Sequence, residues 1–434
     1  MKPKSTSIAT LAALTFTTMA AAANWPHWRG PAYNGSSPEV NLPDTFSKTE
    51  NVKWVVDLPG PSAATPIIWG DTVLVSTIDD QAQVLFAMAL DRKTGRQLWK
   101  QETGVGIRKD RRSNYASPSP ATDGQRAYFF YGNGELIAFD MEGNKAWSQN
   151  LQKEYGEFAF QWTFSTSPTI VDGKLYMQVL QRDVPVNGAG RTDGPNDSYL
   201  LALDSASGKV LWRVVRPSKA RAESLEAFTT PVPEGDQLLV AGGDCLTGHD
   251  LATGKELWRW GTWNPERIGH WRLVPSPVAG EGVVLGCGPK QAPVFAIKME
   301  GRGTLPDSNI AWTSAQPEIS SDVATPLFYK DHFFILNGDR DFIAKVDPTT
   351  GKAVWIGSFG QRVKIESSPT GADGRVYVMN FRGEVFVLEA GEEFKVLHTA
   401  RMGDDGDNEI RASIAVSQGN LFIRTASKLY CIGK

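Results

Sequence analysis

Alternating apolar and polar residues fill most of the chain after residue 50, in eight units of similar build. Each unit opens with two apolar stretches around a tight turn that usually contains Gly or Asp, which is typical of a β-hairpin. A third alternating stretch follows, then a turn that often reads TGK or SGK, then a fourth stretch. Because helical spacing of apolar residues is missing, the pattern predicts four antiparallel strands per unit. The units open at residues 64–77, 116–130, 165–179, 229–242, 275–287, 324–337, 367–380 and 412–425.

The fourth stretch of most units carries a tryptophan. Neighbours lie mostly 43 to 54 residues apart (355−312 is 43, and 312−258 is 54), and such a period indicates a repeat architecture. We expect each ring to dock across the wedge between adjacent units, since burying an aromatic side chain there is strongly favourable. A row of ligand-stacking aromatics is the alternative interpretation. The seven residues are Trp54, Trp99, Trp147, Trp212, Trp258, Trp312 and Trp355.

The two ends of the repeat region complete each other. The eighth unit has only three strands before Lys434, whereas a spare strand, residues 52–57, precedes the first unit. Pairing of these segments closes a ring and removes the exposed edges of an open sheet. The prediction is an all-β fold, an eight-bladed β-propeller of four-stranded antiparallel blades whose last blade is completed by residues 52–57. In blade seven, Leu397 is expected at the tryptophan position.

Residues 1–23 read as a secretory signal peptide, with Lys2 and Lys4 before a short apolar stretch and a run of alanines. A cytoplasmic protein with an Ala-rich start is the alternative. Residues 24–50 are rich in Pro and aromatic residues and are expected to pack on the propeller, residues 51–434, as an extended arm; a ligand-contacting flap is the other possibility. We expect a monomeric periplasmic or extracellular protein without a membrane span, because no apolar run reaches the roughly 18 residues that one needs.

Composition narrows the function classes. A net charge of −3 leaves no electrostatic footprint for nucleic acid, and 41% hydrophobic residues supply ample core. The three cysteines, Cys245, Cys287 and Cys431, are too few and too widely spaced for a disulfide framework or a zinc site. Buried free thiols are expected, although a bridge between Cys245 and Cys287 is conceivable.

The ending D-x-x-T-G-K-x-L-W, best preserved at residues 250–258 and 91–99, resembles the tryptophan-docking repeat of the quinoprotein-like propellers. That superfamily includes pyrroloquinoline-quinone (PQQ) dehydrogenases and the propeller subunit of the outer-membrane protein assembly machine. The opening WPHWRGPAYNG resembles the arm of exported PQQ-like propeller proteins. The resemblance implies the fold over about residues 50–434, whereas it says little about function, because the motif encodes blade packing.

The chain departs from the PQQ dehydrogenases at the positions that carry their chemistry. It has no adjacent cysteine pair and no CxxCH motif for a haem, so no catalytic residue can be carried over. No cofactor is therefore predicted, and PQQ with calcium is kept as an alternative.

A candidate site follows from the topology of a propeller, in which the first strand of each blade lines the central channel. The residues just before each Ser/Thr-Pro step should ring one mouth of the channel, and they are polar, charged or aromatic. Such a ring suits a polar or sugar-like ligand, but the charges could instead pair with one another. The candidates are Arg112, Tyr115, Gln161, Trp162, Glu226, His270, Trp271, Arg272, Asp322, Lys364, Glu366, Glu409 and Arg411.

Three smaller patterns add alternatives. Residues 404–409, DDGDNE, resemble part of a calcium loop without its full spacing, so a solvated acidic turn is the simpler interpretation. His270 could act as an acid or base, but no nucleophile motif such as GxSxG accompanies it. Glu226, Asp322, Glu366 and Glu409 could include a hydrolytic carboxylate pair.

Two function classes remain from the sequence. The favoured one is an exported, non-catalytic propeller that presents its channel mouth to a protein partner or a polar ligand. The alternative is an enzyme at that mouth, either carbohydrate-active or a PQQ-dependent oxidoreductase. The lack of transferable catalytic residues favours the first class.

Overall fold

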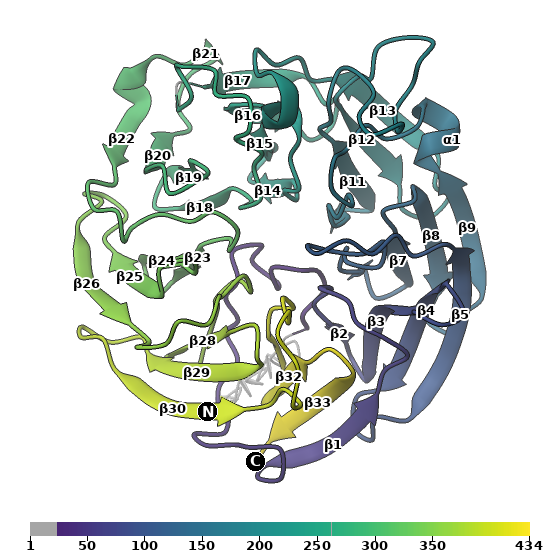
Figure 1. The fold of residues 1–434 in the computed structure, drawn as a ribbon, viewed down its shortest axis with the longest axis vertical. Coiled ribbons are helices and arrows are strands. Elements are labelled where there is room, and N and C mark those ends of the chain that lie inside the picture. Colours follow the sequence, from purple (N-terminus) through teal and green to yellow (C-terminus); the bar gives the residue numbers. More distant parts are fainter. Residues whose placement is uncertain (1–23, 262) are drawn as a thin grey trace, which may run out of the picture.

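A computed structural model describes residues 24–261 and 263–434, and the predicted signal peptide lies outside them. Eight sheets stand around a central axis, each with four antiparallel strands and one of them with a short fifth strand, so the predicted eight-bladed propeller is confirmed (Figure 1). The helical segments are α1 (Leu151–Tyr155), η1 (Ala222–Leu225) and η2 (Asp307–Asn309). Within the described residues, the helices are all too short to cross a membrane.

The strands of each blade run from the channel outward. Blades 1 and 2 are β2 (Ile67–Trp69), β3 (Thr72–Asp79), β4 (Val84–Asp91), β5 (Gln97–Val105), and β6 (Ala121–Thr122), β7 (Arg126–Phe130), β8 (Glu135–Asp140), β9 (Lys145–Asn150). Blades 3 and 4 are β10 (Thr169–Val171), β11 (Lys174–Val179), β12 (Tyr199–Asp204), β13 (Val210–Val215), and β14 (Val232–Glu234), β15 (Gln237–Gly242), β16 (Cys245–Asp250), β17 (Glu256–Trp260). Blades 5 and 6 are β18 (Val278–Gly280), β19 (Val283–Cys287), β20 (Val294–Lys298), β22 (Ile310–Thr313), and β23 (Leu327–Tyr329), β24 (His332–Asn337), β25 (Phe342–Val346), β26 (Ala353–Ser358). Blades 7 and 8 are β27 (Thr370–Ala372), β28 (Arg375–Met379), β29 (Glu384–Glu389), β30 (Val396–Arg401), and β31 (Ala415–Ser417), β32 (Asn420–Arg424), β33 (Lys428–Gly433), β1 (Val52–Asp57).

The ring closes at blade 8, as predicted. β1 pairs antiparallel with β33, and Trp54 lies opposite Cys431 (Figure 1). The closing strand therefore satisfies the outer edge of the C-terminal hairpin, and the two ends of the repeat region share one sheet.

The tryptophans of the fourth strands lie between blades. In six of the seven, the indole N–H donates to a backbone carbonyl in the third-to-fourth-strand turn of the next blade; Trp99, for example, donates to the Met141 carbonyl at 3.0 Å. In five of these six turns a glycine lies against the ring. At Gly143, with φ of +89°, an added Cβ would come within 2.6 Å of Trp99. The TGK turn thus needs glycine for its backbone conformation and for close packing.

Trp258 of blade 4 is the exception, because blade 5 has no TGK turn. Its indole N–H donates to Oε1 of Gln237 within its own blade at 2.6 Å. A segment of blade 5, β21 (Gly303–Thr304), instead adds to β17 as a parallel fifth strand. The insertion before β22 therefore covers part of the outer edge of β17, the fourth strand of blade 4.

The expected tryptophan position of blade seven is wrong by one residue. The register places His398 opposite Val387, where the other blades carry Trp, and Leu397 lies in a β-bulge with its side chain exposed. Sequence alone missed the bulge. His398 bonds the Phe46 carbonyl at 2.7 Å and packs edge-on against the Phe46 ring, so the arm supplies the missing aromatic contact.

Hydroxyl groups join the blades at the channel. The Ser or Thr of each step accepts a hydrogen bond from the backbone N–H of the equivalent residue in the preceding blade, at 2.8–3.2 Å in seven of the eight junctions. The remaining junction joins blade 8 to blade 1, where Thr65 Oγ1 is buried and has no hydrogen-bond partner in the described part of the chain. The Ser/Thr-Pro repeat is therefore an inter-blade clasp. Its members are Thr65, Ser119, Ser167, Thr230, Ser276, Thr325, Ser368 and Ser413.

The arm crosses the centre of the ring on the face opposite the mouth (Figure 1). It bonds the first strands of several blades, for example through Trp25 with Ile68 and through the Tyr33 hydroxyl, which donates to the Ile170 carbonyl at 2.7 Å. Arg29 is buried and donates to the Pro326 and Pro369 carbonyls of blades 6 and 7 at 2.8 and 3.1 Å. Burial lowers its pKa to about 9.

Candidate functional site

A pocket lies in the channel at the mouth, and its walls follow one rule. The residue two positions before each clasp hydroxyl lines it in all eight blades, because alternate residues of an extended segment point to the same side. These residues are Ala63, Ser117, Ser165, Phe228, Val274, Val323, Glu366 and Arg411. Five clasp hydroxyls lie deeper, and Trp28 of the arm lines the far end. We call this cavity of about 160 Å³ the channel pocket.

Glu366 is the centre of an ionic network on one side of the channel pocket. Its carboxylate, nearly buried at 4% exposure, lies 2.7 Å from Arg411, 2.8 Å from Lys364 and 3.4 Å from Arg112. Burial favours the neutral acid, but Arg411 and Lys364 outweigh it and hold the pKa of Glu366 below its ordinary value. Burial lowers the pKa of Lys364, but the neighbouring carboxylates of Glu366 and Asp339 raise it. The net result is a pKa above the ordinary value of lysine. Glu366 and Lys364 are therefore both charged at neutral pH.

Trp162 gathers arginines on the other side. The guanidinium carbons of Arg111, Arg112 and Arg272 lie 5.1, 5.8 and 5.7 Å from the ring centroid. Glu223 accepts from the Trp162 indole at 3.1 Å and from Arg272 at 2.9 Å. This carboxylate thereby fixes both side chains, and the ring face stays among cations, which a π-system attracts.

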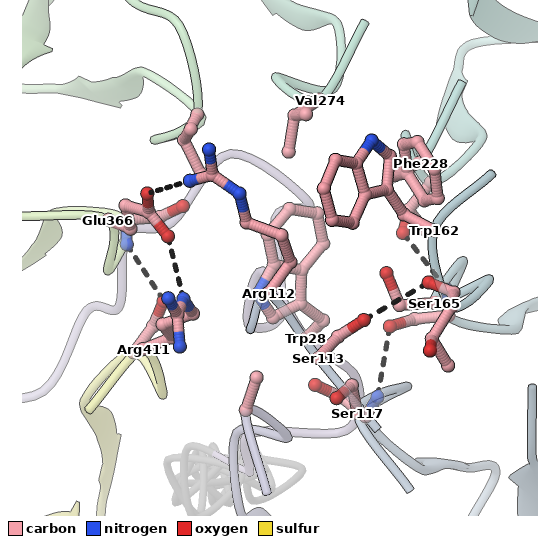
Figure 2. A pocket seen from close by; sticks show the side chains of 18 of the residues that line it. Trp28, Arg112, Ser113, Ser117, Trp162, Ser165, Phe228, Val274, Glu366 and Arg411 are labelled. Carbon is pink, nitrogen blue, oxygen red and sulfur yellow. Dashed lines mark hydrogen bonds and ion pairs between the residues drawn. The ribbon is translucent and has the colours of Figure 1, made fainter. Parts of the chain in front are cut away.

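Arg112 connects the two sides. Figure 2 shows its side chain extending across the pocket toward Glu366, with Trp162 and Phe228 on the opposite wall and Ser113, Ser117 and Ser165 below. Its Nε is buried and has no hydrogen-bond partner within the described chain. The three lining arginines outnumber the one lining carboxylate, Glu366, so the pocket carries an excess of positive charge.

The structure brings five of the predicted mouth residues together and leaves the others outside the pocket. Arg112, Trp162, Arg272, Glu366 and Arg411 line it. Lys364 reaches it through Glu366. The remaining predicted residues are Tyr115, Gln161, Glu226, His270, Trp271, Asp322 and Glu409, and none of them lines it.

Glu226 and Gln161 form a separate buried unit with Arg182. The Glu226 carboxylate is fully buried and bonds Arg182 at 2.5 Å and the Gln161 backbone N–H at 3.2 Å. Burial, only partly opposed by Arg182, raises the pKa of Glu226 to about 7. None of these three residues lines the channel pocket.

The other outlying residues serve packing or surface pairs. Tyr115 and Trp271 pack against hydrophobic clusters, and His270 is exposed. Asp322 pairs with Lys290 at 3.3 Å. Glu409 lies 3.8 Å from Arg411 and lines a smaller cleft beside the pocket.

Neither a calcium loop nor a disulfide forms in the described residues. Asp404 of the acidic segment is held by Lys48 at 2.8 Å and Lys428 at 3.0 Å, which lower its pKa to about 2, and Asp405 pairs with Arg401. No group of three or more potential metal ligands occurs in residues 24–261 and 263–434. The three cysteines are free and buried, and outside the channel pocket.

Comparisons with known proteins follow the fold. The model of the family described as outer membrane protein assembly factor BamB matches residues 46–183 and 89–302, together more than half of the chain. A polyvinylalcohol dehydrogenase of a Pseudomonas species is 27% identical over 210 residues, which are 46% of this chain and 30% of that enzyme. The BamB of Burkholderia pseudomallei is 22% identical over 84% of this chain and 82% of its own.

Among solved structures, a europium-containing methanol dehydrogenase superposes with a TM-score of 0.68 at 11% identity, covering 95% of this chain and 98% of that one. At this identity the superposition shows a shared fold only. The chain spans less than a third of the length of the polyvinylalcohol dehydrogenase that it matches.

Proposed function

The chain belongs to the family of PQQ-like propellers described as outer membrane protein assembly factor BamB, and we propose that it is an exported, non-catalytic propeller that binds a small polar anion in its channel pocket. Export rests on the pattern of residues 1–23. Two tryptophans and three arginines around a blind pocket suit a flat carboxylate, which can stack on a ring and accept charge-assisted hydrogen bonds.

The observation that carries this proposal is the state of Arg112. Its ion pair with Glu366 is the longest of the three at 3.4 Å, its Nε has no partner, and it is 35% exposed. Arg411 and Lys364 remain to neutralise Glu366 when Arg112 turns away. Arg112 is therefore the guanidinium that an incoming carboxylate can engage at least cost.

Titration with phthalate, followed by tryptophan fluorescence and calorimetry, tests the proposal. We expect binding by phthalate but not by the neutral phthalamide, and a loss of about tenfold in affinity in Arg112→Gln, since one charge-assisted hydrogen bond contributes about 1.5–3 kcal/mol. Arg108→Gln, in the same loop but outside the pocket, is the matched control. Equal binding of both probes, or an unchanged affinity in Arg112→Gln, would refute anion recognition.

A quinone-dependent oxidoreductase fits these residues less well. The lining arginines could hold the carboxylates of PQQ, but the calcium that accompanies this quinone needs several oxygen ligands. Glu366 supplies the only lining carboxylate, and three cations already occupy it. A glycosidase is equally unsupported, because Glu226, Asp322, Glu366 and Glu409 are each engaged by a cation.

A scaffold for a protein partner is the second candidate, favoured by the match to BamB over 82% of that protein. Affinity purification from the native cell envelope tests it. Specific recovery of a partner that Arg112→Gln does not release, together with no anion binding, would favour the scaffold over the proposed ligand site.

A further inference from the structure

A second cavity lies on the opposite face of the ring, between the arm and blades 1 to 3. It has a volume of about 460 Å³ and we call it the arm-face hollow. Its lining is Asn24, Pro26, His27, Pro31, Tyr33, Pro38, Trp69, Thr122, Asp123, Ile170, Val171, Asp172 and Gly173. The proposed function makes no use of it.

Two aromatic rings in the arm-face hollow are held in fixed positions. Trp69 lies flat against the backbone of the next blade, since a Cβ on Gly124 would come within 2.2 Å of its indole. Tyr33 stacks on His27 with ring centroids 3.8 Å apart and an interplanar angle of 9°. The Tyr33 hydroxyl donates to Ile170, so the ring cannot swing away. Both rings are half-buried, and such preorganised π-faces attract cations.

The charge of the arm-face hollow is negative. Asp123 and Asp172 line it, whereas no Lys or Arg does. Burial lowers the pKa of His27 to about 3, so this lining residue is neutral at physiological pH. Asp123 is held by the Tyr128 hydroxyl and two backbone N–H groups. Asp172, by contrast, is exposed and has neither a hydrogen bond nor an ion pair in the described part of the chain.

We propose that the arm-face hollow binds a small organic cation of the ammonium or guanidinium type, stacked on Trp69 and Tyr33 and neutralised by Asp172. Aromatic faces and carboxylates around an apolar cavity are the combination that such cations require, because the rings replace lost hydration and the carboxylates balance the charge. A sugar would also stack on Trp69. The excess of two carboxylates without a lining cation, however, favours a positively charged occupant.

The test uses the full chain and a pair of probes that differ only in charge, choline and its neutral isostere 3,3-dimethyl-1-butanol, with arginine amide as the guanidinium probe. Binding is followed by calorimetry and by saturation-transfer NMR. We expect choline or arginine amide to bind and the isostere not to bind. Trp69→Leu and Asp172→Asn should each weaken binding about tenfold. Asp331→Asn is the control, since this exposed hairpin-turn residue of blade 6 has the same positive φ and lies outside the hollow.

Each other outcome overturns the proposal. Equal binding of choline and its isostere would assign an apolar ligand, and binding of maltotriose alone would assign a sugar. Binding of an arginine-containing peptide without either small cation would assign a protein partner. If Trp69→Leu lowers the melting temperature, Asp172→Asn still decides, because Asp172 makes no hydrogen bond or ion pair within the described residues. Phthalate binding in the channel pocket should not change in either variant, so this test is independent of the proposed function.

Discussion

The channel pocket and the arm-face hollow lie on opposite sides of the same short segment, and their electrostatics are opposite. Trp28 of the arm lines the first, and the preceding residue His27 lines the second. The channel pocket is lined by three arginines and one carboxylate, Glu366, which pairs with Arg112, Lys364 and Arg411. The hollow has two carboxylates and no lining cation, and one of these carboxylates, Asp172, has no ion pair or hydrogen bond among the described residues.

The difference separates charges that hold the structure from charges that are free for a ligand. Glu366 joins blade 7 to the loop after blade 1 and to blade 8, so its charge is part of the ring. Asp172 stands on a hairpin turn and makes no hydrogen bond or ion pair in residues 24–261 and 263–434. A buried charge that loses its partner is costly, whereas an exposed unpaired charge is nearly neutral to stability. The two cavities should therefore respond very differently to equivalent substitutions.

Glu366→Gln should have the largest effect. Arg411 and Lys364 lose their counter-charge in a partly buried site, so we expect the free energy of unfolding to fall by about 3 kcal/mol. The freed cations should at the same time raise phthalate affinity about tenfold. Denaturant unfolding and calorimetry measure both.

Glu409→Gln is the matched control for that substitution. Its carboxylate is 52% exposed and 3.8 Å from Arg411, so its loss should cost less than about 0.5 kcal/mol. If the two variants are equally stable, the network at the channel pocket is screened by solvent and the contrast with the hollow disappears.

His27→Phe should have an intermediate effect that depends on pH. His27 is neutral when folded and titrates near pH 6.5 when unfolded, so the unfolded chain binds the extra proton as pH falls. Wild-type stability from this residue is present at pH 7 and is lost as pH falls from about 6.5 toward 3. Between pH 7 and pH 5 the loss is about 2 kcal/mol, and the phenylalanine, which can keep the stack on Tyr33, should lack it.

His249 is also kept neutral by burial, and it is present in both the wild type and His27→Phe. The difference between these two proteins therefore removes its contribution to the pH dependence. Unfolding curves at pH 7 and pH 5 give the difference directly. Equal pH dependence in wild type and His27→Phe would mean that His27 takes up a proton in the folded protein, and the net negative charge of the hollow would then be smaller at low pH.

The fold was predictable because its signals are local. Alternation along each strand and a recurring tryptophan specify the blades, and the unpaired strand at residues 52–57 specifies the closure. The pocket walls were predictable in principle from the same alternation, since each wall residue stands two positions before a clasp hydroxyl. The sequence prediction took all polar and aromatic residues just before each Ser/Thr-Pro step. It therefore included Glu226, which forms a buried ion pair, and left out the wall residues Ser117 and Val274.

The ends of both cavities were not predictable from the sequence, because they depend on where the arm runs. Arg29 fixes that path through carbonyls 297 and 340 residues away. Together with the bonds of Trp25 and Tyr33, these contacts bring Trp28 into the lining of the channel pocket and Tyr33 into that of the arm-face hollow. The segment WRGPAYNG needs glycine at one point of this path. At Gly35, which has a φ of +92°, any side chain would collide with the Arg29 guanidinium.

Asp172→Asn should have the smallest effect on stability and provides the sharpest check of the contrast. The residue has a φ of +49°, a conformation that asparagine tolerates as well as aspartate, and it makes no hydrogen bond in the described chain. We expect the free energy of unfolding to change by less than about 0.5 kcal/mol, as measured beside Glu366→Gln in the same denaturant series. A loss above about 1 kcal/mol would show that Asp172 serves the fold as Glu366 does, and the hollow would then be a structural gap and not a binding site.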